Sequence, residues 1–147
     1  MGIDERRRQK KLAKKAAERK ARQAERKSLV TGGSAKLAAQ FPIGDCLAPI
    51  GLFEEGIGTV VLTRLLPGGE IAVAGFLVDT YCLGAKNALY RVLSLAEYDY
   101  YRGQIEAQTP LERVHPSCLR KLVEGAVRYA RDLGFPPHPD YARAAQL

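Results

Sequence analysis

The sequence has no tryptophan, one methionine and no long apolar run among its 147 residues. A helix that crosses a membrane needs roughly 18 consecutive apolar residues, and no segment of the chain approaches that length. The N-terminus lacks the apolar core of a secretory signal, and its acids (Asp4, Glu5, Glu18 and Glu25) are out of place in a mitochondrial presequence. We therefore expect a cytoplasmic protein.

Cysteines are also few, and their spacing favours no particular chemistry. Cys46, Cys82 and Cys118 are an odd number and include no C-x-x-C pair, so no disulfide framework is predicted. His115 and Cys118 stand three residues apart at an expected helix start and could face one metal ion, if Cys46 and Cys82 supplied two more ligands. His115 serves equally well as the N-cap of that helix, so we predict no metal site and no cofactor.

Positive charge is abundant but confined to one end of the chain. Residues 1–30 hold 12 Lys and Arg against 4 acids, a net charge of +8, whereas residues 31–147 hold 11 against 12, a net charge of −1. A domain that binds nucleic acid through its folded surface normally spreads positive charge over that surface. The N-terminal arm is therefore the part expected to bind a polyanion. The predicted nucleic-acid-binding residues are Arg6, Arg7, Arg8, Lys10, Lys11, Lys14, Lys15, Arg19, Lys20, Arg22, Arg26 and Lys27.

The composition of this arm predicts a helix that reads no bases. Residues 4–27 include no glycine, proline or β-branched residue, which favours a helix. Its apolar stripe consists only of alanines and is too thin to bury much area. The isolated helix should therefore be only marginally stable, and binding to a polyanion should stabilise it. The arm has no aromatic side chain to stack on bases, so we expect recognition of the phosphate backbone or of shape.

We divide the chain into a basic helical arm (residues 1–30), a flexible Gly/Ser linker (31–36) and a small domain (37–147). Residues 37–55 are interrupted by proline and glycine, and we predict a short helical turn followed by irregular structure along one edge of a sheet.

The clearest strand signals follow. Residues 57–66 and 71–78 are apolar runs joined by Pro67-Gly68-Gly69-Glu70, which predicts a β-hairpin. The second run is apolar on both faces and should be a central strand. Residues 88–93 predict a third strand.

Two helices are predicted after the strands. Ser94 and Glu97 form a capping-box pattern, so one helix should run from Leu95 to about residue 107. A second should start at Pro116, because apolar residues recur at helical spacing up to Leu133 and a Gly134 stop signal follows. The predicted fold is α+β: a three-stranded antiparallel meander with two helices packed on one face, preceded by a long basic N-terminal helix.

Two groups of side chains could carry chemistry or binding in the domain. Asp79, Cys82 and Lys86 follow the central strand and could act as base, nucleophile and charge stabiliser. Equally, Cys82 could be a buried apolar residue and Asp79 could cap the turn.

The tyrosines form the second group. Tyr98, Tyr100 and Tyr101 could offer a stacking surface for single-stranded RNA. Two of them fall on the buried side of the helix predicted from Leu95, so we expect core packing.

Residues 76–86 and 124–140 carry a resemblance to known proteins. They contain V-D-x-x-C-L-G-x-K (Val78 to Lys86) and G-F-x-P-H-x-D (Gly134 to Asp140) segments. Through these segments the chain resembles an uncharacterised group of bacterial proteins over roughly residues 55–141. The group brings no assigned activity, but the resemblance implies a bacterial cytosolic setting and marks His138 and Asp140 as residues to watch beside Asp79, Cys82 and Lys86.

The sequence as a whole favours a non-enzymatic binding protein. Its arm attaches to RNA or to a ribonucleoprotein such as the ribosome, and its neutral domain positions the arm or recruits a protein partner. The alternative is a small hydrolase or nuclease with a site around Asp79, Cys82, Lys86 and His138, in which the arm only concentrates the substrate.

Overall fold

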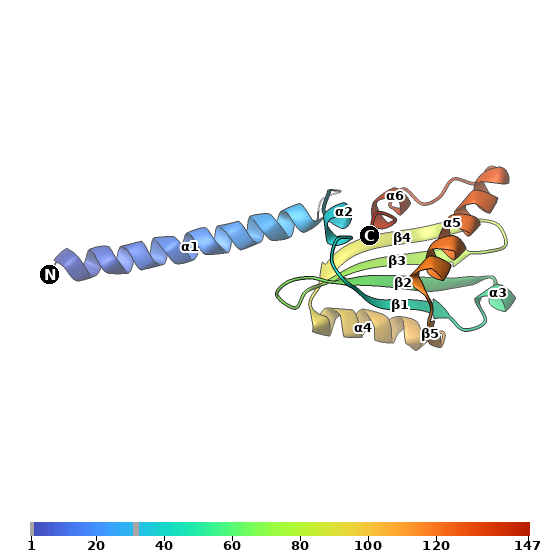
Figure 1. The fold of residues 1–147 in the computed structure, drawn as a ribbon, viewed down its shortest axis with the longest axis horizontal. Coiled ribbons are helices and arrows are strands. Elements are labelled where there is room, and N and C mark those ends of the chain that lie inside the picture. The colour runs from blue at the N-terminus through green and yellow to red at the C-terminus, as the bar shows by residue number, and fades with distance from the viewer. Residues whose placement is uncertain (1, 31–32) are drawn as a thin grey trace.

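The structure, a computed structural model, describes residues 2–30 and 33–147 (Figure 1). Its helices are α1 (Gly2–Val30), α2 (Gly33–Ala38), α3 (Leu52–Glu55), α4 (Leu95–Glu106), α5 (Pro116–Asp132) and α6 (Tyr141–Ala144). Its strands are β1 (Ile43–Pro49), β2 (Ile57–Leu65), β3 (Ile71–Asp79), β4 (Gly84–Leu93) and β5 (Leu111–Arg113). The fold is α+β with a long N-terminal helix, as predicted.

The strands form one antiparallel sheet in the order β4-β3-β2-β1-β5. The predicted meander is its β2-β3-β4 part, and the turn between β2 and β3 has positive φ at Gly68 and Gly69. β4 begins at Gly84, four residues before the predicted third strand. The prediction of three strands is wrong in number, because β1 and β5 extend the sheet beyond β2.

β1 occupies a stretch that the sequence predicted to be irregular. Gly44 lies within it because a Cβ there would meet Thr63 Oγ1 of the neighbouring β2 at 2.8 Å. Pro49 is the last residue of the strand, where the proline interrupts no further ladder. Leu47 and Ala48 are both buried although successive strand residues face opposite sides of the sheet. The sheet is thus covered on both faces at β1.

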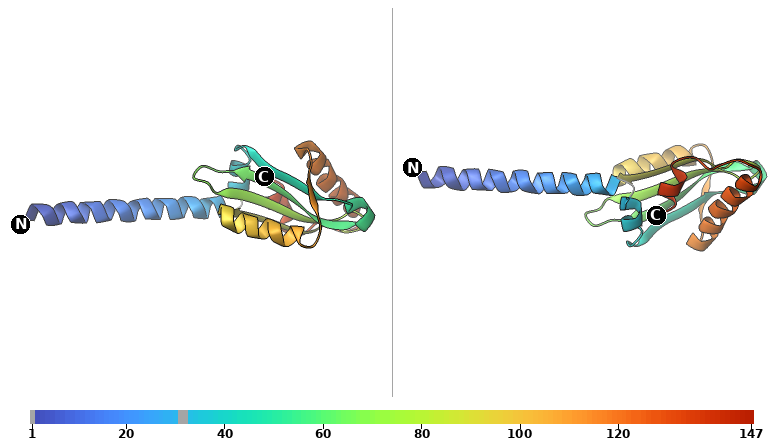
Figure 2. Two further views of the ribbon diagram at one scale, coloured as in Figure 1. Left: turned by 90° about the horizontal axis from the view of Figure 1, so that it is seen from below. Right: turned by 90° about the horizontal axis from the view of Figure 1, so that it is seen from above.

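The helices cover both faces of the sheet, not one face as predicted. α4 packs on the face that carries Leu47, Val61 and Val73. α5 packs on the other face. There its Leu119 and Val123 join a core formed by the strand residues that point away from α4. Figure 2 shows α4 and α5 on opposite sides of the sheet. Helices on both faces explain why residues 71–78 are apolar without alternation.

α2 corrects the predicted linker. Residues 33–36 belong to this helix, and Ala35 and Ala38 are fully buried in the core. Their burial, which composition alone does not reveal, makes this segment part of the domain. Residues 31 and 32 of the predicted linker lie outside the described residues.

Local signals at the helix ends are confirmed. Ser94 and Glu97 form the reciprocal capping box of α4. The His115 side chain caps α5 by accepting a hydrogen bond from the backbone N–H of Ser117. At the other end of α5, Gly134 has a φ of 91°, and Phe135 N–H donates to the carbonyl of Ala130.

α1 confirms the predicted helical arm and extends a few residues beyond residues 4–27 at both ends. Its 29 residues give a length of about 43 Å at 1.5 Å per residue. The helix projects away from the sheet, and its C-terminal end lies beside α2 and β4 (Figures 1 and 2). Within the described ranges, no helix combines the length and apolarity needed to cross a membrane.

Candidate nucleic-acid interface

The side chains of α1 are exposed from residue 5 to residue 23. Ten of the twelve predicted nucleic-acid-binding residues lie in this exposed stretch: Arg6, Arg7, Arg8, Lys10, Lys11, Lys14, Lys15, Arg19, Lys20 and Arg22. Arg26 and Lys27 belong to α1, but their side chains lie outside the described part of the structure. These ten cations are therefore presented to solvent along most of α1.

Five of these cations form a stripe along one side of α1. Arg8, Lys11, Lys15, Arg19 and Arg22 are spaced by three or four residues, which places them one above another on a helix. We call this set the basic stripe. Its ends are 14 residues apart, so it spans about 21 Å of the helix axis. The only acid between its ends is Glu18, so the stripe has a strongly positive field.

The side of α1 away from the basic stripe carries Ala13, Ala17 and Ala21, which are exposed as well. A helix normally gains stability by burying an apolar face against the rest of its domain. No described residue of the domain covers these alanines. Residues 5–23 of the arm therefore expose charged side chains to solvent and do not pack in the core of the domain.

The candidate catalytic group lies at the turn between β3 and β4. The Asp79 carboxylate accepts hydrogen bonds from the backbone N–H groups of Tyr81 and Cys82, at 2.9 and 3.1 Å. This confirms the interpretation of Asp79 as a turn-capping residue. Cys82 is only partly buried, so the alternative picture of a core cysteine is wrong.

Lys86 and His138 lie near this turn. Lys86 is exposed, and His138 is held against β4 by a hydrogen bond from its backbone N–H to the carbonyl of Ala85. The imidazole Nδ1 of His138 accepts from the backbone N–H of Asp140 at 3.1 Å. The structure therefore gathers the marked residues at one end of the sheet, with Asp79 and His138 already engaged by backbone groups.

The remaining cysteines and histidine offer no metal centre in the described chain. Among the residues described, no three His, Cys, Asp or Glu side chains come close enough together to hold a metal ion. Cys46 is buried, and this burial, helped by the nearby Cys118, raises the pKa of its thiol. The neutral thiol of Cys46 is a weak nucleophile and a poor metal ligand.

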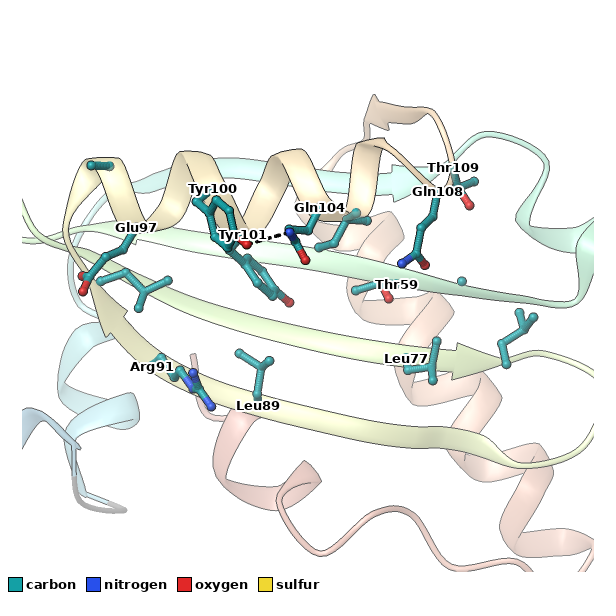
Figure 3. A pocket seen from close by; sticks show the side chains of 15 residues that line it. Thr59, Leu77, Leu89, Arg91, Glu97, Tyr100, Tyr101, Gln104, Gln108 and Thr109 are labelled. Carbon is teal, nitrogen blue, oxygen red and sulfur yellow. Dashed lines mark hydrogen bonds between the residues drawn. The ribbon is translucent and has the colours of Figure 1, made fainter.

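A cleft of about 940 Å³ opens between α4 and the strands β2, β3 and β4 (Figure 3). We call it the α4 cleft. Its floor includes Leu77 and Leu89, and its α4 wall includes Tyr100, Tyr101 and Gln104. Two further clefts, of about 480 and 760 Å³, lie along α5 on the other face of the sheet. None of the three is lined by Asp79, Cys82, Lys86 or His138.

The three tyrosines of α4 have different environments. Tyr98 is buried and is a core residue as predicted. Tyr100 is 71% exposed, and its hydroxyl accepts a hydrogen bond from Gln104 Nε2 at 2.9 Å. Tyr101 is partly buried over Gly75 of β3, where a Cβ would collide with its hydroxyl. Tyr100 and Tyr101 therefore both present ring surface to the α4 cleft.

A nearly buried carboxylate fastens α4 to the sheet. Asp45 of β1 accepts hydrogen bonds from the Tyr98 hydroxyl at 2.7 Å, from Arg102 at 3.0 Å and from Arg113 at 3.1 Å. Burial first, and then the bond to Asp45, raise the pKa of Tyr98. Sequence patterns did not reveal this network, because the partners of Asp45 are 53 to 68 residues away along the chain.

Comparison of the chain with protein-family models, with curated proteins and with solved structures gives no match. The candidate interface therefore rests on the geometry and charge of the chain itself.

Proposed function

We propose that this chain is a non-enzymatic RNA-binding protein. In this proposal α1 attaches the protein to RNA or to a ribonucleoprotein such as the ribosome, and the domain positions the arm or recruits a partner protein. The setting is cytoplasmic.

The observation that carries the proposal is the basic stripe on a helix that projects from a neutral domain. Five cations in about 21 Å can each replace counterions on a phosphate backbone, which makes binding strong at low salt and steeply salt-dependent. The exposed alanines opposite the stripe leave the helix free to lie on a polyanion without breaking any packing in the domain. The absence of aromatic residues from residues 1–30 favours contacts with phosphates over contacts with bases.

The proposal is tested by removing three positive charges from the arm in one variant and three from the domain in another, and comparing how each variant binds RNA. An arm variant replaces Lys11, Lys15 and Arg22 with Gln. Its control replaces three exposed cations of α5, Lys121, Arg128 and Arg131, with Gln. Affinity for a labelled RNA strand is measured by fluorescence anisotropy across a salt series.

We expect the arm variant to bind more weakly and to have a smaller salt slope, by about 2, because each lost contact on a single strand removes about 0.7. The α5 control should keep the slope of the unmodified protein. Equal losses in both variants would show that net charge alone attracts RNA, and an unchanged slope in the arm variant would refute the role of the basic stripe.

A further inference from the structure

The residues that line the α4 cleft are suited to binding flat aromatic rings that carry hydrogen-bonding groups on their edges. Tyr100 and Tyr101 supply aromatic faces, and Leu77 of β3 and Leu89 of β4 supply an apolar floor (Figure 3). Gln104, with Gln108 and Thr109 further along, adds amide and hydroxyl groups that donate and accept hydrogen bonds. An unpaired nucleobase matches this set, because its faces stack and its edge carries donors and acceptors.

The cleft exists because α4 covers only part of its face of the sheet. Leu77, Leu89 and Leu93 are only partly buried, although their strands β3 and β4 are otherwise largely buried on the α5 face. Gly75 contributes no side chain, and this lets the Tyr101 hydroxyl rest on β3. The hydrogen bond from Gln104 holds the Tyr100 ring at the rim. The aromatic surface is thus already in position.

The cleft and the arm meet at the same end of the molecule. Arg91 lies in β4 two residues before Leu93, and α4 starts at Leu95. Figures 1 and 2 show α1 leaving the domain at this end, near the start of α4, and Arg91 lies toward this end of the cleft in Figure 3. The exposed guanidinium of Arg91 continues the positive charge of the arm onto the rim of the cleft.

We propose that the α4 cleft binds the unpaired bases of a single-stranded RNA whose backbone is held by α1. Arg91 contacts a phosphate at the mouth, Tyr100 and Tyr101 stack on bases, and Gln104 bonds to a base edge. This inference rests on the proposed RNA-binding function and adds to it a preference for unpaired over paired RNA, because a duplex hides the faces of its bases.

The test uses the full chain and two labelled probes of equal length, a single RNA strand and a blunt RNA duplex. The cleft variant is Tyr100→Ala, which removes an exposed ring and leaves the core intact. Its control is Tyr129→Ala, which removes a half-exposed ring from α5 on the other face of the sheet. A second measurement, photocrosslinking of a strand that contains 4-thiouridine, maps the contact by mass spectrometry without any substitution.

We expect Tyr100→Ala to weaken binding of the single strand by about 5- to 150-fold, since stacking on one aromatic ring contributes in this range. Binding of the duplex should stay unchanged, Tyr129→Ala should alter neither, and crosslinks should fall on Tyr100, Tyr101 or their neighbours in α4. Equal affinity for both probes, together with crosslinks confined to α1, would overturn the cleft assignment and leave the arm proposal standing. A protein that binds neither probe at low salt would overturn both.

Discussion

The arm and the domain of this chain use their residues in opposite ways. In α1, every side chain from residue 5 to residue 23 faces solvent, and these residues carry a net charge of +8, more than the +7 of the whole chain. In the domain, Val60, Val61 and Val73 are fully buried and charges are nearly balanced. If α1 is the attachment segment that we propose, attachment and folding are separated within 147 residues. Changes in the arm should alter binding without altering stability, and changes in the core should do the reverse.

The largest expected effect on stability is at Gly84. Its φ is +64°, and a Cβ would lie 2.9 Å from the Ala126 carbonyl oxygen and 2.9 Å from Ala130 Cβ in α5. Gly84→Ala should lower the free energy of unfolding by about 3 kcal/mol, from the left-handed backbone and from overpacking against the helix. Denaturant unfolding measures this loss.

The matched control is Gly69→Ala. Gly69 has a similar φ of +83°, but nothing described lies within 4 Å of the place its Cβ would take. This substitution should cost only about 1 kcal/mol. If both variants lose the same free energy of unfolding, close contact with α5 is not the reason that position 84 requires glycine. If Gly84→Ala also weakens RNA binding while still folded, the separation of arm and domain is broken.

The next largest effect concerns Tyr98 and its pH dependence. Tyr98→Phe removes the hydrogen bond to Asp45 and should cost about 1.5 kcal/mol at neutral pH. The pKa of Tyr98 is raised in the folded protein, mainly by burial, so its contribution is fully present below the unfolded value of about 10 and is lost as pH rises above it. The stability difference between the unmodified protein and Tyr98→Phe should therefore shrink above about pH 10.

The control for this series is Tyr100→Phe, which changes an exposed hydroxyl on the same helix. It should leave the free energy of unfolding unchanged at neutral pH and should follow the unmodified protein at alkaline pH. A stability difference between the unmodified protein and Tyr98→Phe that stays constant from pH 7 to beyond about pH 10 would argue against the raised pKa.

A smaller effect is expected at the start of α4. Ser94→Ala removes half of the capping box, in which the hydroxyl accepts from the backbone N–H of Glu97 at 3.2 Å. The cost should be about 1 kcal/mol, measured by thermal or denaturant unfolding. Ser117→Ala is the control, because the cap of its helix is His115 rather than serine. Equal losses would mean that the two serines do not differ as caps.

Elements with local signals could be predicted from the sequence, whereas their arrangement could not. The Ser94 cap, the Gly134 stop and the Pro67–Glu70 turn each depend on residues within one or two turns of chain. β1 and β5 were missed because their stability comes from pairing with strands far away, as Leu47 does with Val61 and with Arg113. The side of the sheet that α4 covers follows from Asp45 and Tyr98, which are 53 residues apart.

The candidate site divides in the same way. The cations of α1 could be predicted because a helical arm needs no partner to expose them. The α4 cleft could not, because Leu77, Leu89 and Tyr101 come together only through the register of β3 with β4 and the approach of Tyr101 to Gly75. Asp79 was correctly interpreted as a possible turn cap, because an Asp that accepts hydrogen bonds from backbone N–H groups two and three residues ahead is a local feature of the chain.

The smallest expected change in stability, and the sharpest test of the comparison, comes from the arm itself. Replacing Ala17 and Ala21 with Gly alters no charge and removes no described packing, but each glycine costs a helix interior about 1 kcal/mol. Because α1 folds outside the core, the unfolding midpoint of the domain should stay the same while circular dichroism at 222 nm shows less helix. RNA affinity should fall modestly, since the basic stripe is aligned only while the helix is formed.

The substitutions Ala17→Ser and Ala21→Ser provide an intermediate step with a smaller helix cost. A lowered domain midpoint in the glycine variant would show that α1 is part of the cooperative fold, and unchanged affinity would show that RNA needs the charges of the arm but not their helical alignment.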